Sequence, residues 1–465
     1  MNFLLFLGFN GAVQAVSKLR ENLQSELLFN TNTSDEWSGN VRFEVMHYFT
    51  NLPESPQLTY SQFLSARLSG QKEFNYLKTF LDISAGTFFS RAHSHFILHE
   101  GYGEAKTQNI ELYLGRKKMN WSGLDRWAQL GLWQPKFAMD ALRPEAQGLT
   151  GLFVQYESEY IQSMGFLSPL FLPSMGPEIR EEDGGLVSDS RWYRAPSREF
   201  SFSENQPNVV QYKLDLNDVF RMLGSHGLGA SLHLGKKDRG WGARFSSGFK
   251  PMNDLVLRRQ IFKEVALDQV SVTVSPLVGY HSLNSMDIEY TGTQYSLGFS
   301  YLEDFPENEL PDPNWSTQNL EGVKIYGAHI GFNIKNNLYE NLNAELGIVK
   351  VNGGEIHDVL NTGERDEITI FSHRSFQFQN AAILKLDGIL GRVYGNPLIT
   401  RFKYIYDNEQ SGNLLSAEFL YYPTSTWALV FGGDTLSSQS ENLSDAFLNQ
   451  FRANDRVYGG MTYVF

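Results

Sequence analysis

Apolar and polar residues alternate along most of this 465-residue chain, in segments of about ten residues. In one segment Trp241, Phe245 and Phe249 share one parity, while Arg244 and Lys250 share the other. Successive side chains of a β-strand point to opposite faces, so each segment predicts a strand with one apolar and one polar face. The candidate strands cover 22–30, 40–48, 60–68, 79–89, 94–102, 107–117, 130–138, 149–157, 208–217, 226–236, 240–250, 254–264, 269–280, 292–302, 322–334, 340–351, 376–387, 397–407, 413–422, 426–434 and 455–465. Bacterial single-chain barrels have an even number of strands, so some of these segments must be loops or merge.

The composition of the two faces distinguishes between two all-β architectures. The polar face is rich in glycine, serine and single charges, and the apolar face carries tyrosine, phenylalanine and tryptophan. This combination is typical of a polar lumen and aromatic girdles, whereas a soluble sandwich, the alternative, has few glycines on its outer face. A closed sheet also satisfies its own backbone groups in lipid without a long apolar run. We therefore predict an all-β, transmembrane, antiparallel up-and-down β-barrel of about 18 strands, with 16 as the next choice.

Both ends of the sequence suggest export. Residues 1–15 contain a short apolar stretch followed by Val13-Gln14-Ala15, which predicts a signal peptide, with a buried first strand as the alternative. At the other end, Val457, Tyr463 and Phe465 share one face of the last predicted strand. This ending is similar to the terminal strand of Gram-negative outer-membrane proteins. The resemblance implies the barrel-assembly machinery as a partner and the cell outer membrane as the location.

Residues 16–465 are expected to form one barrel domain with three long connections, at 158–207, 303–321 and 352–375. A connection as long as 158–207 is usually either an external loop or an in-folded constriction. The formal net charge of −13 argues against a nucleic-acid partner, because phosphate binding needs concentrated Lys and Arg. Cysteine is absent, which excludes thiolate metal sites.

Charged residues on the polar faces are the candidates for lining a pore. Basic and acidic members are nearly balanced, so no strong charge filter is expected. The candidate pore-lining residues are Arg42, Glu44, Arg67, Asp82, Glu111, Lys213, Asp215, Arg244, Lys250, Glu345, Arg401 and Lys403.

Three further groups bear on ligand chemistry. Within 158–207, a basic and aromatic group has the chemistry to stack on and hydrogen-bond a sugar or anion, although a solvated loop or one facing lipopolysaccharide is favoured. That group consists of Arg191, Trp192, Tyr193, Arg194 and Arg198. His93, His95 and His99 share a strand parity, but neutral lumen histidines are favoured over metal ligands, so no metal or cofactor is expected. Ser225 and His226 are adjacent and would point to opposite faces of a strand, so no catalytic dyad and no enzyme activity is expected.

One stretch resembles a known class of barrel. It comprises His99-Glu100-Gly101-Tyr102, then Glu111 to Lys117, then Trp121, Asp125 and Trp127. These paired segments resemble porin-like and alginate-export-type outer-membrane barrels. The resemblance implies a channel for diffusion or export of a small hydrophilic solute or glycan, surrounded by outer-membrane lipid and lipopolysaccharide. Because three long loops could fill the lumen, a plugged docking barrel of an envelope complex is the alternative.

Overall fold

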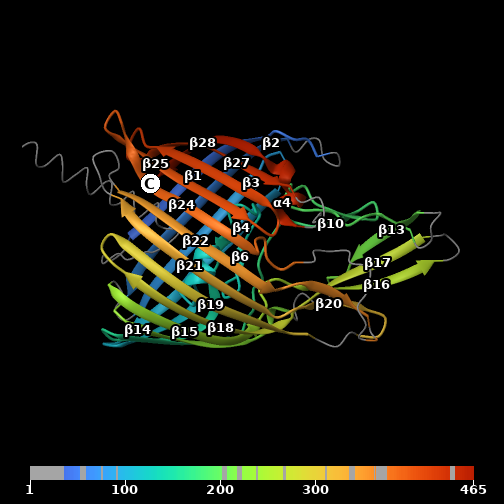
Figure 1. The fold of residues 1–465 in the computed structure, drawn as a ribbon, viewed down its shortest axis with the longest axis horizontal. Helices are drawn as coiled ribbons and strands as arrows, with labels where there is room; N and C mark the ends of the chain where they lie inside the picture. Colours follow the sequence, from blue (N-terminus) through green and yellow to red (C-terminus); the bar gives the residue numbers. More distant parts are fainter. Residues whose placement is uncertain are drawn as a thin grey trace, which may run out of the picture.

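The computed structural model describes residues 36–52, 59–74, 77–90, 93–201, 207–216, 222–236, 239–264, 269–308, 312–334, 341–360, 362, 374–439 and 446–465. Its main feature is an antiparallel sheet of 18 strands that closes on itself, because β1 pairs with both β2 and β28 (Figure 1). The prediction of an 18-stranded up-and-down barrel is confirmed. No helix among the described residues is both long and apolar enough to cross a membrane.

The barrel strands follow one another in space in the order of the sequence. They are β1 (Glu36–Tyr48), β2 (Tyr60–Phe74), β3 (Leu77–Phe88), β4 (His93–Lys106), β5 (Ile110–Lys117), β8 (Leu149–Glu157), β9 (Ile161–Ser168), β14 (Gly227–Gly235), β15 (Gly240–Pro251), β18 (Tyr280–Thr291), β19 (Tyr295–Glu307), β21 (Val323–Ile334), β22 (Asn341–Gly353), β24 (Asn380–Val393), β25 (Asn396–Asp407), β26 (Gly412–Tyr421), β27 (Trp427–Ser438) and β28 (Arg456–Val464).

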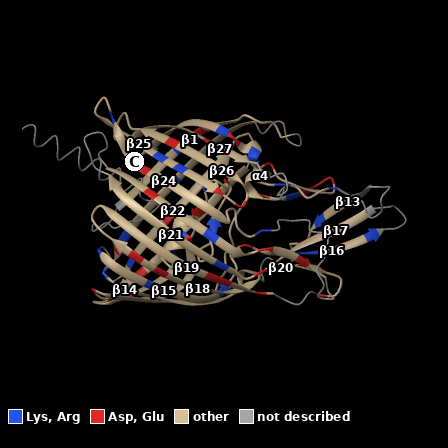
Figure 2. Ribbon diagram, in the orientation of Figure 1, with Lys and Arg blue, Asp and Glu red and all other residues tan. Residues whose placement is uncertain are grey.

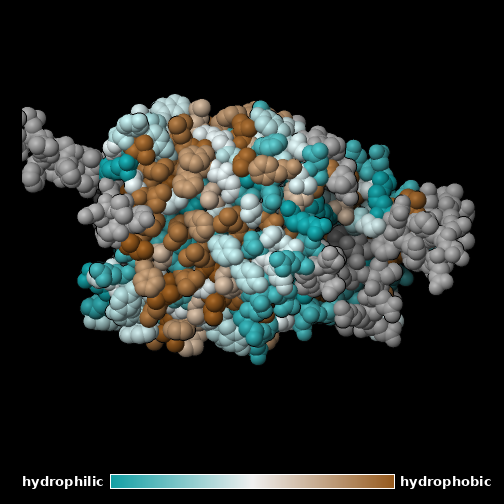
Figure 3. Space-filling view, turned by 45° about the horizontal axis from the view of Figure 1, so that its top comes forward, coloured by the Kyte–Doolittle hydropathy of each residue, from teal (hydrophilic) through white to brown (hydrophobic). Residues whose placement is uncertain are grey.

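Inward and outward side chains alternate along these strands. In the β14–β15 pair, Leu228, Trp241 and Phe245 point outward and are exposed, while Ser231 and Ser246 face each other inside and are buried. Figure 3 shows apolar side chains gathered over the barrel wall, with hydrophilic ones concentrated towards the end that carries a second sheet. Rows of large apolar side chains on the outside of a closed barrel suit hydrocarbon rather than water. The barrel is therefore of the transmembrane kind.

The two ends of the barrel differ in their connections. At one end, the turn end, β8 and β9 are joined by residues 158–160 alone, and β24 and β25 by Tyr394 and Gly395. Both of these last residues have positive φ, at 51° and 84°, as a two-residue type I′ hairpin requires. At the other end, the loop end, most connections are long, and several carry structure of their own, although β3–β4 and β25–β26 are joined by residues 89–92 and 408–411 alone.

Strands from four of the long connections form a six-stranded sheet beyond the barrel, which we call the outer sheet (Figure 1). In spatial order they are β12 (Glu199–Ser201), β13 (Pro207–Leu214), β17 (Gln269–Leu277), β16 (Val256–Glu264), β20 (Ser316–Leu320) and β23 (Ile356–Val359). β13 and β17 are parallel, and Val210, Tyr212 and Val272 lie in the sheet's own apolar cluster. The assignment of 208–217, 254–264 and 269–280 to the barrel is therefore wrong. Alternation indicates a strand, but not the sheet to which the strand belongs.

The predicted connections also need correction. Residues 158–207 include barrel strand β9, and 303–321 begins inside β19. Much of 352–375 and the predicted strand 22–30 lie outside the described residues. A further long connection, residues 118–148 between β5 and β8, was not predicted, and within it the predicted strand at 130–138 is reduced to β6 (Lys136–Phe137). This connection holds α2 (Gly123–Ala128) and β7 (Glu145–Ala146), and it occupies the lumen.

Candidate permeation path

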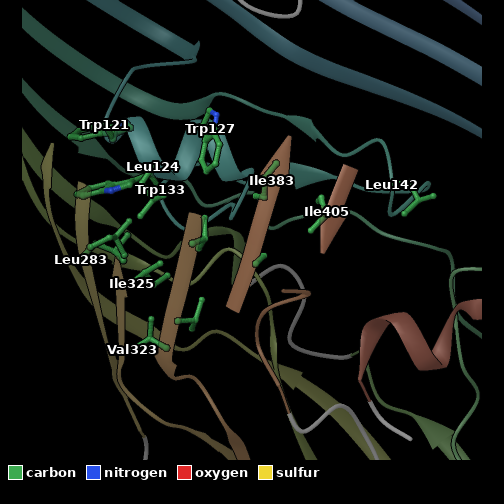
Figure 4. Close-up of a cluster of buried hydrophobic side chains, with 14 of the residues drawn as sticks. Trp121, Leu124, Trp127, Trp133, Leu142, Leu283, Val323, Ile325, Ile383 and Ile405 are labelled. Carbon is green, nitrogen blue, oxygen red and sulfur yellow. The ribbon is translucent and has the colours of Figure 1, made fainter. Parts of the chain in front are cut away.

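Residues 118–148 fold into the barrel, and we refer to this segment as the plug (Figure 4). Its helix α2 is capped at the N-terminus by Ser122, whose hydroxyl accepts the Asp125 N–H, and at the C-terminus by Gln129 with φ 56°. Beyond the helix, the Asp125 carboxylate accepts the backbone N–H groups of Leu132 and Trp133, each at 3.0 Å. These bonds fold the chain back on itself and bring Trp133 beside the start of the helix.

The plug carries its own apolar cluster and extends it to the wall. Trp121 and Trp133 stack with ring centroids 4.9 Å apart, and both are almost fully buried. Leu124 joins them, and wall residues such as Leu283 and Ile325 close the cluster from β18 and β21 (Figure 4). Truncating a buried tryptophan of this kind typically costs about 3–5 kcal/mol. The buried contacts between the plug and the barrel wall are therefore of the kind found in a protein core.

Glycines on the inner wall receive the large side chains of the plug. A Cβ atom built on Gly347 would lie 2.5 Å from the ring of Trp127, and one on Gly327 would lie 2.3 Å from Leu124. Gly248 stands in the same relation to Trp133, at 3.0 Å. Part of the glycine-rich face is therefore a packing surface for the plug. The prediction that this face borders an open polar lumen therefore needs correction at these glycines.

Hydrogen bonds also join the plug to the barrel strands that it packs against. The Trp127 indole N–H donates to Glu345 at 3.0 Å, and the Lys385 ammonium donates to the Trp127 carbonyl. The Ser246 hydroxyl donates to the carbonyl of Trp121 at 2.6 Å. A cavity of about 70 Å³ remains between the plug and strands β22 to β26.

A different environment lines the lumen at β25 to β28 and at β1 to β3, where inward charges form what we call the charged wall: Arg42, Glu44, Arg67, Asp82, Arg401, Glu418, Asp434 and Arg456. Arg42 donates to Glu418 at 2.8 Å, and Arg401 donates to the same carboxylate at 3.3 Å. Arg67 holds both oxygens of Asp82, at 2.8 and 2.7 Å. Figure 2 shows basic and acidic residues interspersed over the barrel strands rather than separated by sign.

The plug reaches the charged wall with charges that the sequence analysis did not include. Asp140 lies 2.6 Å from Arg456, Arg143 lies 3.5 Å from Glu44, and Glu145 lies 3.5 Å from Arg67. The side chains of Arg401, Arg143 and Arg42 are 30%, 29% and 22% exposed, while those of Glu418 and Glu44 are 10% and 3% exposed. These arginine side chains are therefore more accessible than the carboxylates that pair with them.

The candidate pore-lining residues fall into three places. Arg42, Glu44, Arg67, Asp82 and Arg401 lie on the charged wall. Four further candidates also point inward: Arg244, Lys250, Glu345 and Lys403. Glu111 accepts a hydrogen bond from the Tyr113 hydroxyl near the turn end. Of these, Lys403 donates to a plug carbonyl at 3.3 Å, Glu345 binds Trp127, and Lys250 is buried. Lys213 and Asp215 belong to β13 and its end, outside the barrel, so their assignment to the lumen is wrong.

The basic and aromatic group of the β9–β14 connection mainly joins loops to one another. Arg191 is fully buried and donates to Asn454 at 3.0 Å and to the Thr50 carbonyl at 2.8 Å. Trp192 packs on Phe451 with ring centroids 5.5 Å apart, in the connection that carries α4 (Phe447–Gln450) and η3 (Arg452–Asn454). The structure gives this pair a structural role in place of the expected ligand contact.

The remaining members of that group bond to backbone carbonyls: Arg194 to Gln450, Tyr193 to Leu186 in β11 (Gly185–Val187), and Arg198 to Asp183, just after β10 (Arg180–Glu182). Burial raises the pKa of Tyr193 to about 12 and that of Tyr212 to about 12. Both phenols therefore remain neutral hydrogen-bond donors at physiological pH. This network ties the outer sheet to the loop end of the barrel.

The three histidines of β4 have separate partners. His93 lies 2.8 Å from Glu178, His95 stacks on Phe63, and His99 lies 2.8 Å from the Ser84 hydroxyl. Within the described ranges, no cluster of three or more His, Cys, Asp or Glu residues could hold a metal ion. Ser225 and His226 lie in the loop just before β14, where the His226 ring contacts the Gly224 carbonyl at 3.1 Å.

Comparison with known proteins gives an architectural likeness only. No family model and no curated protein sequence matches the chain. Among solved structures, OccAB4 of Acinetobacter baumannii is 11% identical with a TM-score of 0.48, covering 93% of this chain and 98% of that one. A multiply substituted Rh. blastica porin is 9% identical with a TM-score of 0.40, covering 93% and 100%. OmpT of Vibrio cholerae is 8% identical with a TM-score of 0.39, covering 94% and 99%.

Identities and scores at this level carry no argument about cargo or site residues, so the architecture rests on the strand pairing itself. That pairing makes the chain a closed 18-stranded antiparallel barrel of porin-like form, with an in-folded plug.

Proposed function

We propose that this chain is an outer-membrane channel through which small hydrophilic solutes diffuse along the charged wall. The observation that carries the proposal is the unequal lining of the lumen. The plug packs on apolar side chains and glycines of the wall, whereas Arg42 and Arg401 of the charged wall, and Arg143 of the plug beside them, remain partly exposed. Charged side chains that remain partly exposed in the lumen lower the barrier for a polar solute.

The plug limits the size of the solute. An 18-stranded barrel encloses a wide lumen when it is empty. Here Trp121, Leu124 and Trp133 take up much of that space, and Arg143 and Glu145 extend across to the charged wall. The proposed cargo is therefore a small molecule that passes beside the plug rather than a folded or bulky polymer.

Single-channel recording of the purified, folded chain in planar bilayers tests this function. We expect discrete conductance steps and, in a salt gradient, a reversal potential that moves towards cation selectivity in Arg401→Glu. The expected change is several-fold in the ratio of anion to cation permeability, because the substitution replaces a lumen cation with an anion.

Lys324→Glu provides the matched control, since Lys324 is an exposed lysine on the outer side of β21. That variant should leave the reversal potential unchanged. A correctly folded barrel that never conducts would contradict the channel and would favour the closed docking barrel instead.

A further inference from the structure

The outer side of the barrel carries a depression of about 630 Å³ over strands β18 to β25. The register of the sheet places one outward residue from each of these six strands in a row along it: Ile288, Phe299, Ala328, Ile348, Ala382 and Tyr406. This volume is within the range of pockets that bind small ligands. The depression opens onto the surface that faces lipid in a transmembrane barrel.

Large and small side chains alternate within that row. Phe299 and Ile348 flank Ala328, and Ile348 and Tyr406 flank Ala382. Neighbouring strands are about 4.8 Å apart, so the large side chains stand about 10 Å apart across each alanine. Each alanine therefore forms the floor of an apolar slot with tall sides.

A lysine lies at the edge of these slots. Lys350 occupies the next row towards the loop end, between Tyr326 and Asn380, and it is exposed. Tyr326 and Tyr301 pack together in the same row, with ring centroids 5.1 Å apart, as in an aromatic girdle at the lipid–water boundary. Within the part of the chain that the structure describes, Lys350 makes no ion pair or hydrogen bond. A cation at this level of the membrane is stabilised when a lipid supplies the anion.

We propose that the depression binds lipopolysaccharide, with an acyl chain in the slots at Ala328 and Ala382 and a phosphate of its lipid moiety on Lys350. Barrels of this class have short turns on the periplasmic side and long loops outside, which places Lys350 at the level of the external leaflet. The inference rests on the outer-membrane location proposed above, and it does not depend on conduction.

Counting bound lipid on the delipidated, detergent-solubilised barrel by native mass spectrometry tests the inference, with purified lipopolysaccharide as the probe. Ala328→Phe and Ala382→Phe fill the slots, so each should weaken binding at least tenfold. Lys350→Gln should weaken it several-fold, and Lys350→Arg should restore it.

Two matched variants serve as controls. Ala230→Phe adds the same bulk to an outward alanine of β14, and Lys324→Gln removes a neighbouring outward lysine, so neither should alter binding. Equal binding by Ala328→Phe, equal binding of phosphatidylglycerol, or occupation of the depression by a second copy of the chain would each overturn the inference. Unchanged single-channel conductance in Ala328→Phe separates a failure of this inference from a failure of the proposed channel.

Discussion

At the scale of single residues, the alternation of the sequence predicts which face of the sheet a side chain points to. It does not predict what that side chain contacts. Arg42, Arg67 and Arg401 point inward as alternation predicts, because the side-chain period of a strand is fixed at two. Gly327 and Gly347 also point inward, but only the structure shows that they touch Leu124 and Trp127. Such contacts join residues far apart in the sequence, and no local pattern records them.

Replacing Gly347 with alanine tests the packing of the plug on the wall. The new Cβ would lie 2.5 Å from Trp127 and 2.6 Å from the Ala328 carbonyl oxygen, so one of them must move. Overpacking of this kind costs about 1–3 kcal/mol, and we expect a lower unfolding temperature in detergent. Gly165→Ala is the control, because a Cβ there meets no atom within 4 Å. Equal unfolding temperatures for both variants would show that the plug does not bear on the wall at Gly347.

At the scale of elements, strands with clear alternation are predicted, and strands with mixed faces are missed. On β9 the outward face carries Ser163 and Gly165 beside Ile161 and Leu167, so its apolar contrast is weak. The plug could not be predicted from periodicity, because its helix α2 has only six residues, too few to show a helical repeat of apolar residues. The stretch that resembles other barrels does include Trp121, Asp125 and Trp127, which begin the plug.

Asp125 organises the plug as an element. Asp125→Ala leaves the N–H groups of Leu132 and Trp133 without their acceptor, which costs about 1–3 kcal/mol for each buried donor. We expect the barrel to fold while residues 118–148 become sensitive to limited proteolysis. Arg126→Ala, which truncates an exposed side chain of the same helix, should remain resistant. Protease resistance in Asp125→Ala would mean that the apolar cluster alone holds the plug.

At the scale of the whole molecule, the number of barrel strands is predicted correctly although the set of strands is not. Segments 208–217, 254–264 and 269–280 lie in the outer sheet, while β9 and β18 take places in the barrel that no predicted segment covers. Closure depends on pairing between the first and last strands, which the sequence does not encode locally. The location and the size of the free lumen depend on how the plug packs against the barrel strands. Those contacts join segments that are far apart in the sequence.

Removing the first half of the plug separates the contribution of its apolar cluster from that of the wall. If residues 120–134 are replaced by a short Gly/Ser linker, the pairing of β1 with β28 and of β5 with β8 remains available, so the barrel should still close. The space vacated by Trp121, Leu124 and Trp133 would then fill with water, and single-channel conductance should rise several-fold. Selectivity should change less than conductance, because Arg42 and Arg401 stay on the charged wall. A folded variant with the conductance of the parent chain would mean that ions do not pass through the lumen beside the plug.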